Sequence, residues 1–295
     1  MKPEWLRRKL PDPQALGKMR GLLQRHGLST VCQGALCPNQ GECFGQGTAT
    51  FLILGKTCTR NCTFCAIPTK DDPPAPDPDE PRRIAEASGE LGLKHVVVTS
   101  VTRDDLGDGG ASHFARTVEA LRKMNPQIIV EILIPDFQGS IEALKTVMDS
   151  DPNILNHNLE TVPRLYPQIR PQAVYYRSID LLQTAKALAP EVFTKSGLML
   201  GLGEEREEIL RVMAELRKIS CDFLTLGQYL RPSGKHHPVA RYITPEEFEE
   251  LRVEGERMRF RAVFSAPLVR SSFHAAEVFK KNQPLALGGQ LEEKF

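Results

Sequence analysis

The sequence Ala-Thr-Phe-Leu-Ile-Leu-Gly-Lys-Thr-Cys-Thr-Arg-Asn-Cys-Thr-Phe-Cys, residues 49–65, joins a short apolar run to three closely spaced cysteines. Its first six residues are typical of a buried β-strand. Three cysteines follow with C-x3-C-x2-C spacing: Cys58, Cys62 and Cys65. Three more precede the run with C-x4-C-x5-C spacing: Cys32, Cys37 and Cys43. Thiolates grouped in threes suit iron–sulfur clusters, which usually take four cysteines. Each triplet therefore leaves one iron for another ligand, and function is expected at that iron.

The rest of the chain alternates between short apolar runs and longer amphipathic ones. Six apolar runs are predicted to be strands: Ala49–Leu54, His95–Ser100, Ile128–Ile134, Ile154–Leu159, Phe193–Leu200 and Phe223–Tyr229. Six longer runs are predicted to be helices: Arg82–Leu91, Ala111–Met124, Ser140–Met148, Ser178–Leu188, Glu204–Ile219 and Pro245–Met258. The apolar runs lack strict alternation, as expected of strands buried on both faces of a parallel sheet. These successive strand–helix units predict an α/β fold.

Two parallel architectures fit such a repeat, and the turn after the first strand distinguishes them. A doubly wound sheet that binds a nucleotide carries a glycine-rich turn there, whereas here Leu54 leads towards the cysteines. In a β/α barrel the chemistry lies on loops after the carboxyl ends of the strands, where these cysteines fall. Six units rather than eight predict a partial (β/α)6, TIM-like barrel over residues 49–258. Residues 1–48, with a helix near Leu16–His26, and residues 259–295 are predicted to be extensions.

The composition indicates an ordinary globular protein. Of the 295 residues, 41% are hydrophobic and 25% charged, which is enough apolar material for a full core. The net charge of +1 gives no reason to expect a nucleic acid or an anionic membrane surface as partner. No apolar run approaches the roughly 20 residues of a membrane span, and the basic N-terminus lacks the apolar stretch of a secretory signal. We expect a cytoplasmic protein and a monomer.

Disulfides and zinc are the main alternatives for the cysteines. Disulfide frameworks are typical of short secreted chains, and seven cysteines would leave one unpaired. Structural zinc sites most often use two C-x2-C pairs, and only Cys62 and Cys65 form such a pair. The seventh cysteine, Cys221, begins an apolar run and is expected to be a small core residue. An iron–sulfur protein in a reducing compartment is therefore the favoured interpretation.

The C-x3-C-x2-C motif, with Phe64 before its last cysteine and a strand before its first, resembles the radical S-adenosylmethionine (SAM) superfamily. In that superfamily the three cysteines hold a 4Fe–4S cluster whose fourth iron binds SAM, and an electron from the cluster releases a 5′-deoxyadenosyl radical. The C-x4-C-x5-C triplet shortly before it resembles the lipoyl synthase family. Further stretches carry this resemblance over nearly the whole chain: Thr99–Leu106, Asp108–Ala111, Asn156–Val162, Lys195–Glu204, Leu226–Leu230 and Arg270–Ala275.

The resemblance implies a second, auxiliary 4Fe–4S cluster carried by the two extensions. Its ligands would be three cysteines and one serine: Cys32, Cys37, Cys43 and Ser272. Serine oxygen is a harder and weaker partner for iron than thiolate, which suits a cluster that is opened and consumed as the sulfur donor. Phe273 stands where the family has tyrosine, and the loss of one hydroxyl is expected to do little damage.

The implied reaction inserts two sulfur atoms into an octanoyl chain on a lysine of a lipoyl-carrier domain. The adenosyl radical would remove hydrogen from C6, the carbon radical would attack a sulfide of the auxiliary cluster, and a second SAM would repeat this at C8. The implied partners are octanoylated carrier domains of 2-oxoacid dehydrogenase E2 subunits or the glycine cleavage H protein. An electron donor such as ferredoxin or flavodoxin and an iron–sulfur carrier protein are also implied. The residues expected to carry the chemistry are Cys58, Cys62, Cys65 and Ser272.

Several polar residues near the ends of predicted strands are candidates for contact with SAM: Asn158, Glu160, Lys195, Gln228 and Arg103. They can equally be ordinary loop or barrel-lining groups. Asp104 and Asp105 fit loop structure or contacts with positive partners, because radical hydrogen abstraction needs no carboxylate base. His236 and His237 lack a third ligand at metal spacing and are expected in a solvated loop. Arg270 either counters cluster charge or lies at the surface.

Two other functions stay open on the sequence. A methylthiotransferase would insert sulfur into a different substrate, but such enzymes carry their extra cysteines in a separate N-terminal domain that residues 1–48 are too few to form. A non-catalytic iron–sulfur electron carrier has no need of six strand–helix units with polar loops. Formation of 5′-deoxyadenosine from SAM and a reductant would separate a catalyst from a carrier.

Overall fold

The computed structural model describes residues 3–7, 13–34, 37, 39, 43 and 50–272. Its strands are β1 Ser29–Thr30, β2 Thr50–Ile53, β3 His95–Ser100, β4 Ile129–Leu133, β5 Ile154–Asn156, β6 Phe193–Leu200, β7 Phe223–Gln228 and β8 Ala262–Ser265. Its α-helices are α1 Pro13–Arg25, α2 Val31–Gly34, α4 Glu80–Glu90, α5 Ala111–Met124, α6 Ile141–Met148, α7 Tyr166–Ile169, α8 Tyr175–Leu188, α9 Arg206–Lys218 and α10 Pro245–Arg257. Short 3-10 helices cover Glu4–Leu6, Phe137–Gly139 and Pro163–Leu165.

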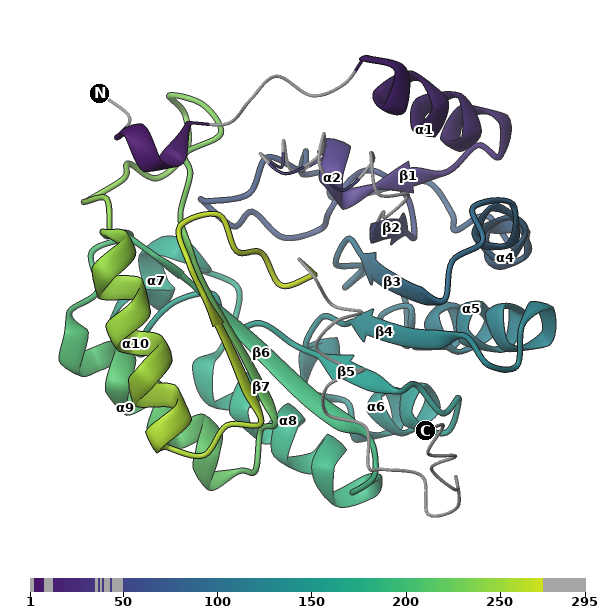
Figure 1. Cartoon of the computed structure of the whole chain (residues 1–295). Helices are drawn as coiled ribbons and strands as arrows, with labels where there is room; N and C mark the ends of the chain where they lie inside the picture. The colour runs from purple at the N-terminus through teal and green to yellow at the C-terminus, as the bar shows by residue number, and fades with distance from the viewer. Residues whose placement is uncertain are drawn as a thin grey trace, which may run out of the picture.

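A single sheet holds the strands in chain order from β1 to β8. Strands β2 to β8 pair in parallel, while the short β1 runs antiparallel to β2. The sheet curves, and α4, α5 and α6 lie outside one half of it while α8, α9 and α10 lie outside the other (Figure 1). The predicted α/β partial barrel is confirmed. Strand β8 was not predicted, so the parallel sheet continues beyond residue 258.

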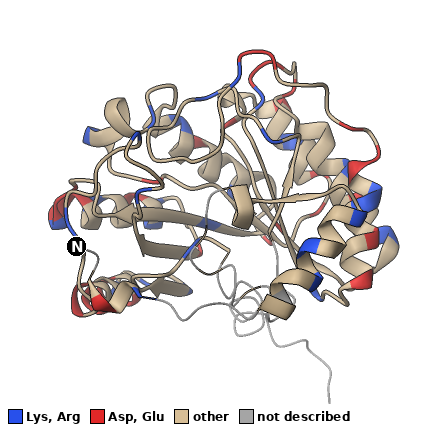
Figure 2. Ribbon diagram, turned by 90° about the horizontal axis from the view of Figure 1, so that it is seen from above, with Lys and Arg blue, Asp and Glu red and all other residues tan. Residues whose placement is uncertain are grey.

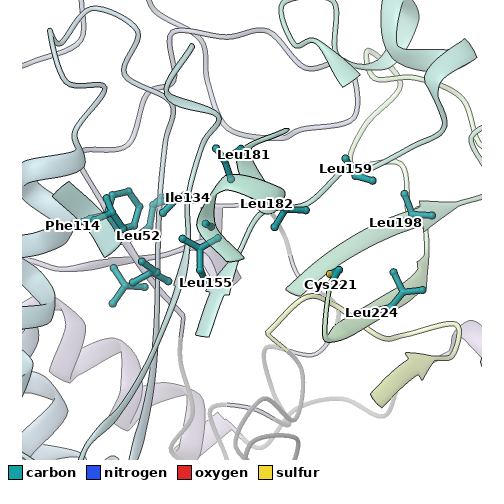
Figure 3. Packing of buried hydrophobic residues seen from close by; sticks show 14 of the residues in the cluster. Leu52, Phe114, Ile134, Leu155, Leu159, Leu181, Leu182, Leu198, Cys221 and Leu224 are labelled. Carbon is teal, nitrogen blue, oxygen red and sulfur yellow. The ribbon is translucent and has the colours of Figure 1, made fainter. Parts of the chain in front are cut away.

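The core lies mainly between the convex face of the sheet and the outer helices. Successive residues of a strand face opposite sides, so Leu155 packs in the large outer cluster while its neighbour Ile154 faces the barrel interior. Figure 3 shows Leu155 and Leu198 from the sheet in this packing with Leu182 of α8. Inside the barrel, Ile154 packs with Phe193 and Phe223. The interior face also carries buried polar side chains, among them Glu131 and Lys195.

The helix ends follow local sequence signals. α10 begins at Pro245 because the Thr244 hydroxyl accepts the backbone N–H of Glu247, while the Glu247 carboxylate accepts that of Thr244. Acidic and basic residues are interspersed along the outer helices (Figure 2). Among the helices of the described residues, none is long and apolar enough to cross a membrane.

Candidate active site

The loop that carries the second cysteine triplet leaves the barrel at the end of β2. Leu54 and Gly55 adopt positive φ angles of 67° and 103°, which turn the chain out of the strand. The backbone N–H of Leu54 donates to Glu80 at 2.9 Å, and its carbonyl accepts the Arg103 guanidinium at 3.0 Å. These two contacts fix the direction in which the loop starts.

A buried arginine inside the cysteine triplet holds the loop on the sheet. Arg60 forms two hydrogen bonds with Asp104, at 2.6 and 2.9 Å, and a third with Asp136 at 2.6 Å. Burial opposes ionisation of Asp136, but the bond to Arg60 outweighs it and lowers the pKa of Asp136 to about 2. The loop is therefore joined to the ends of β3 and β4 by a charged network. Asp105 similarly pairs with Arg103, so the expected contacts of both aspartates with positive partners are confirmed.

The three cysteines open onto one cavity of about 200 Å³ at the carboxyl ends of the strands. Its lining is formed by Val31, Leu52, Cys58, Cys62, Phe64, Cys65, Ile67, Thr99, Ser100, Val101, Thr102, Leu133, Ile134, Pro135, His157, Asn158, Glu160 and Arg170. The thiols thus share a half-enclosed space with a carboxylate, an amide and a guanidinium.

The chemistry of this donor set fits an iron–sulfur cluster. All three thiols are free, and the Cys58 sulfur accepts the backbone N–H groups of Arg60 and Thr102 at 3.4 and 3.3 Å. Hydrogen bonds to the sulfurs help to set the reduction potential of clusters held by cysteine thiolates. Burial and the neighbouring thiols raise the pKa of Cys65 to about 12, and burial also raises that of Cys62. Bound iron would supply the positive charge that three adjacent thiolates need.

Asn158, Glu160 and Arg170 form a polar wall of the same cavity. The Asn158 amide donates to Glu160 at 3.1 Å, and Glu160 has a φ of 67°. Arg170 donates to the carbonyls of Asn158 and Leu159 at 3.0 and 3.1 Å and lies over the Tyr166 ring. Burial raises the pKa of Glu160, against the opposing influence of Arg170. A carboxylate and a guanidinium thus line the same cavity as the cysteines.

Lys195 and Gln228 are not part of this wall. Lys195 lies in the barrel interior, where its ammonium binds the buried carboxylate of Glu131 at 2.9 Å. The Gln228 amide donates to the carbonyls of Leu200 and Arg241 and accepts the N–H of Ile243 at 2.8 Å. Their polar atoms are engaged in holding strands and loops together. Arg103 likewise braces the end of β2, and Cys221 is fully buried in the core as expected.

Cys32 of the first triplet and the C-terminal Ser272 both lie beside Thr50, at the opposite end of β2. Cys32 is buried in α2, and the backbone N–H of Cys37 donates to its carbonyl at 3.0 Å. The Thr50 hydroxyl donates to the Ser272 hydroxyl oxygen at 2.8 Å. Burial raises the pKa of the Cys32 thiol to about 11, although hydrogen bonds from Thr50 oppose this. Residues from both ends of the chain are thus brought together, while Phe273 lies outside the described residues.

The segment that carries Ser272 crosses the barrel interior after β8. The N–H of Ala266 donates to Leu226, and the N–H of Gln228 donates to Pro267, each at 3.2 Å. A Cβ on Gly227 would stand 2.1 Å from the Val269 carbonyl oxygen, so this close approach requires glycine. Arg270 follows, and its positive charge opposes the rise that burial causes in the pKa of Glu160.

Two histidines that were expected in a solvated loop contact the cysteine loop instead. A ring nitrogen of His236 hydrogen-bonds the Cys65 carbonyl at 3.0 Å, and the N–H of His237 donates to Thr63 at 2.9 Å. The His237 carbonyl in turn accepts the Tyr229 hydroxyl at 2.8 Å. The prediction of a solvated loop missed these contacts because a hydrogen bond between residues 171 positions apart leaves no pattern in the sequence.

Comparisons with known proteins agree with this arrangement. The radical SAM superfamily model matches residues 52–216. The lipoyl synthase of Trichlorobacter lovleyi is 58% identical over 275 residues, which cover 93% of this chain and 97% of that protein. The lipoyl synthase of Caldanaerobacter subterraneus subsp. tengcongensis is 56% identical, with 93% and 95% coverage.

Solved structures share the fold at low sequence identity. The structure of HydG, a maturase of the [FeFe]-hydrogenase, matches with a TM-score of 0.58 at 15% identity, over 72% of this chain and 49% of that one. Methylornithine synthase (PylB) matches with a TM-score of 0.54 at 14% identity, over 72% of this chain and 62% of that one. The barrel is therefore shared well beyond the sequences that resemble this chain.

Proposed function

Because the chain belongs to the lipoyl synthases of the radical SAM superfamily, we propose a role in sulfur insertion for each group of residues at the two ends of β2. As a member of this family it is a radical SAM sulfurtransferase that uses SAM and 4Fe–4S clusters and acts on lipoyl-carrier proteins.

We assign the radical-generating cluster to Cys58, Cys62 and Cys65. When bound there with SAM, it supplies the electron that releases the 5′-deoxyadenosyl radical. The cavity wall would orient SAM: Arg170 offers positive charge to a carboxylate, and Glu160 with Asn158 offers acceptors and a donor to amino or hydroxyl groups. Phe64 and the apolar residues beside the thiols would exclude water from the radical.

We assign the auxiliary cluster to Cys32, Cys37, Cys43 and Ser272, where it would supply the two sulfur atoms. The observation that carries this assignment is the hydrogen bond between Ser272 and Thr50, which lies beside Cys32. Ser272 is more than 200 positions away from both of these residues in the sequence. The backbone N–H of Cys43 donates to the carbonyl of Asn39 at 3.0 Å, and the Asn39 amide donates to Leu268 at 2.7 Å. The first triplet is thus tied to the serine segment at a second point.

The same proposal covers the partners and the setting. We propose octanoylated domains of 2-oxoacid dehydrogenase E2 subunits or the glycine cleavage H protein as substrates. A ferredoxin or flavodoxin would supply electrons, and an iron–sulfur carrier would rebuild the consumed cluster. We further propose a monomer in the reducing cytoplasm, with the auxiliary ligands carried by residues 1–48 and by the segment after β8.

Iron and sulfide analysis of anaerobically prepared variants tests the assignment. The unaltered protein should bind about eight iron and eight sulfide per chain, as expected for two 4Fe–4S clusters. Replacing Cys32, Cys37 and Cys43 with alanine should halve both numbers, abolish lipoylation and leave 5′-deoxyadenosine formation intact. Replacing Cys58, Cys62 and Cys65 should also halve them but abolish 5′-deoxyadenosine formation. A protein that never exceeds four iron would contradict the proposal.

A further inference from the structure

We propose that Thr50 is a positioning residue that sets the geometry of Ser272 towards the auxiliary cluster, an inference that rests on the proposed ligand assignment. Thr50 is the first residue of β2 and is 4% exposed. It lies on the same face of the strand as Leu52, which lines the central cavity. Its side chain is therefore anchored by the sheet, whereas Ser272 lies in an irregular segment.

The hydrogen-bonding capacity of Thr50 matches a bridge between two ligands. A threonine hydroxyl has one proton to donate, and it donates that proton to Ser272 Oγ at 2.8 Å. Thr50 also lies beside the Cys32 thiol, and its backbone and hydroxyl lower the pKa of that thiol against the effect of burial. Since the single hydroxyl proton serves one acceptor at a time, the backbone is left for Cys32 and the hydroxyl for Ser272. One strand residue thus contacts a ligand from each end of the chain.

This contact fixes where the serine oxygen can bind metal. The Ser272 oxygen accepts a hydrogen bond from Thr50, so only the lone pairs that are not directed at Thr50 are left to bind metal. The Asn39 amide donates to the Leu268 carbonyl, and the Thr50 hydroxyl donates to the Ser272 hydroxyl oxygen. The Asn39 contact is made to the backbone of the serine segment, whereas the Thr50 contact is made to the ligand itself. Thr50 therefore acts on the orientation of the ligand rather than only on the path of the backbone.

Substitution of Thr50 by valine removes the donor at nearly constant shape, and Thr50→Ser retains it. Thr117→Val in α5 is the matched control, because this buried hydroxyl donates to the His113 carbonyl far from both cysteine triplets. In reconstituted Thr50→Val protein, a chelator should remove auxiliary iron about five- to tenfold faster, as expected for the loss of one hydrogen bond. The Mössbauer signal of the oxygen-ligated iron should shift, while 5′-deoxyadenosine formation stays unchanged. Thr50→Ser and Thr117→Val should match the unaltered protein in all three measurements.

Unchanged iron release and an unchanged Mössbauer spectrum in Thr50→Val would overturn the inference. If valine disturbs the strand, Thr50→Ala removes the same hydroxyl without the branched bulk and is judged by the same two measurements. Ser272→Ala distinguishes this failure from that of the ligand assignment. If Ser272→Ala leaves the spectrum unchanged, Ser272 is no ligand and both proposals fail. If it alters the spectrum and Thr50→Val does not, only the role of Thr50 is wrong.

Discussion

Replacing Arg60 with methionine tests whether the charged network behind the cysteine loop stabilises the protein. The substitution leaves the carboxylate of Asp136 fully buried without its main partner, a change that typically costs about 3–5 kcal/mol. Arg177 still reaches the other oxygen of Asp136 at 3.4 Å. We therefore expect the unfolding free energy to fall by about 3 kcal/mol, the lower end of that range. Asp104 is 26% exposed and can turn to water, so it adds at most about 1 kcal/mol. The melting temperature should fall by roughly 6–12 °C.

A double-mutant cycle separates the ion pair from the shape of the side chain. Arg60→Met with Asp136→Asn removes both charges, and the coupling free energy from unfolding experiments should be at least about 2 kcal/mol. Arg177→Met is the control, because that longer and half-exposed contact should cost less than about 1 kcal/mol. Coupling below about 0.5 kcal/mol between Arg60 and Asp136 would refute the reasoning, since the pair would then contribute nothing beyond packing.

Three further perturbations probe other parts of the molecule. Gly227→Ala should displace Val269 and lower auxiliary iron while 5′-deoxyadenosine formation persists; full iron content would contradict the crossing path described for residues 266–272. Burial lowers the pKa of His157 to about 4 from an ordinary 6.5, so its contribution is complete above pH 6.5 and is lost as the pH falls towards 4. Unfolding free energy should therefore drop by about 2 kcal/mol between pH 7.5 and 5 through this group, and His157→Gln should flatten the profile. Lys195→Met should destabilise the protein by about 3 kcal/mol, and adding Glu131→Gln should restore part of this in denaturation experiments; equal stability of both variants would argue against the pair.

The barrel could be predicted from the sequence because its signals are local. Apolar runs such as His95–Ser100 and the amphipathic run Ala111–Met124 have the bounds that the structure gives to β3 and α5. Strand β8 escaped prediction because Ala262–Ser265 is short and half-exposed, so its apolar content is too small to stand out. It becomes a strand by pairing with β7, which is a tertiary effect.

The candidate site likewise contains residues that the sequence could predict and residues that it could not. The cysteine spacing places Cys58, Cys62 and Cys65 on one loop, and the loop position after β2 places them at a shared cavity with Asn158 and Glu160. The sequence did not indicate Arg170 or the histidine contacts, because no spacing rule links them to the cysteines. Lys195 was expected near the cofactor because it lies near an end of a predicted strand. That end is the start of β6 rather than its carboxyl end, and there the side chain forms a buried ion pair with Glu131.

The meeting of Thr50 with Ser272 joins positions separated by 222 residues, and this separation sets an order for maturation. A ribosome delivers the chain from its first residue onwards, and early segments can fold before later ones exist. The triplet at 58–65 is complete once a small part of the polypeptide has emerged. In the proposed assignment the other centre lacks its oxygen ligand until translation has nearly finished. Its complete set of ligands therefore exists only in the finished polypeptide, and a truncated product ending before residue 272 would offer three cysteines at each of the two places.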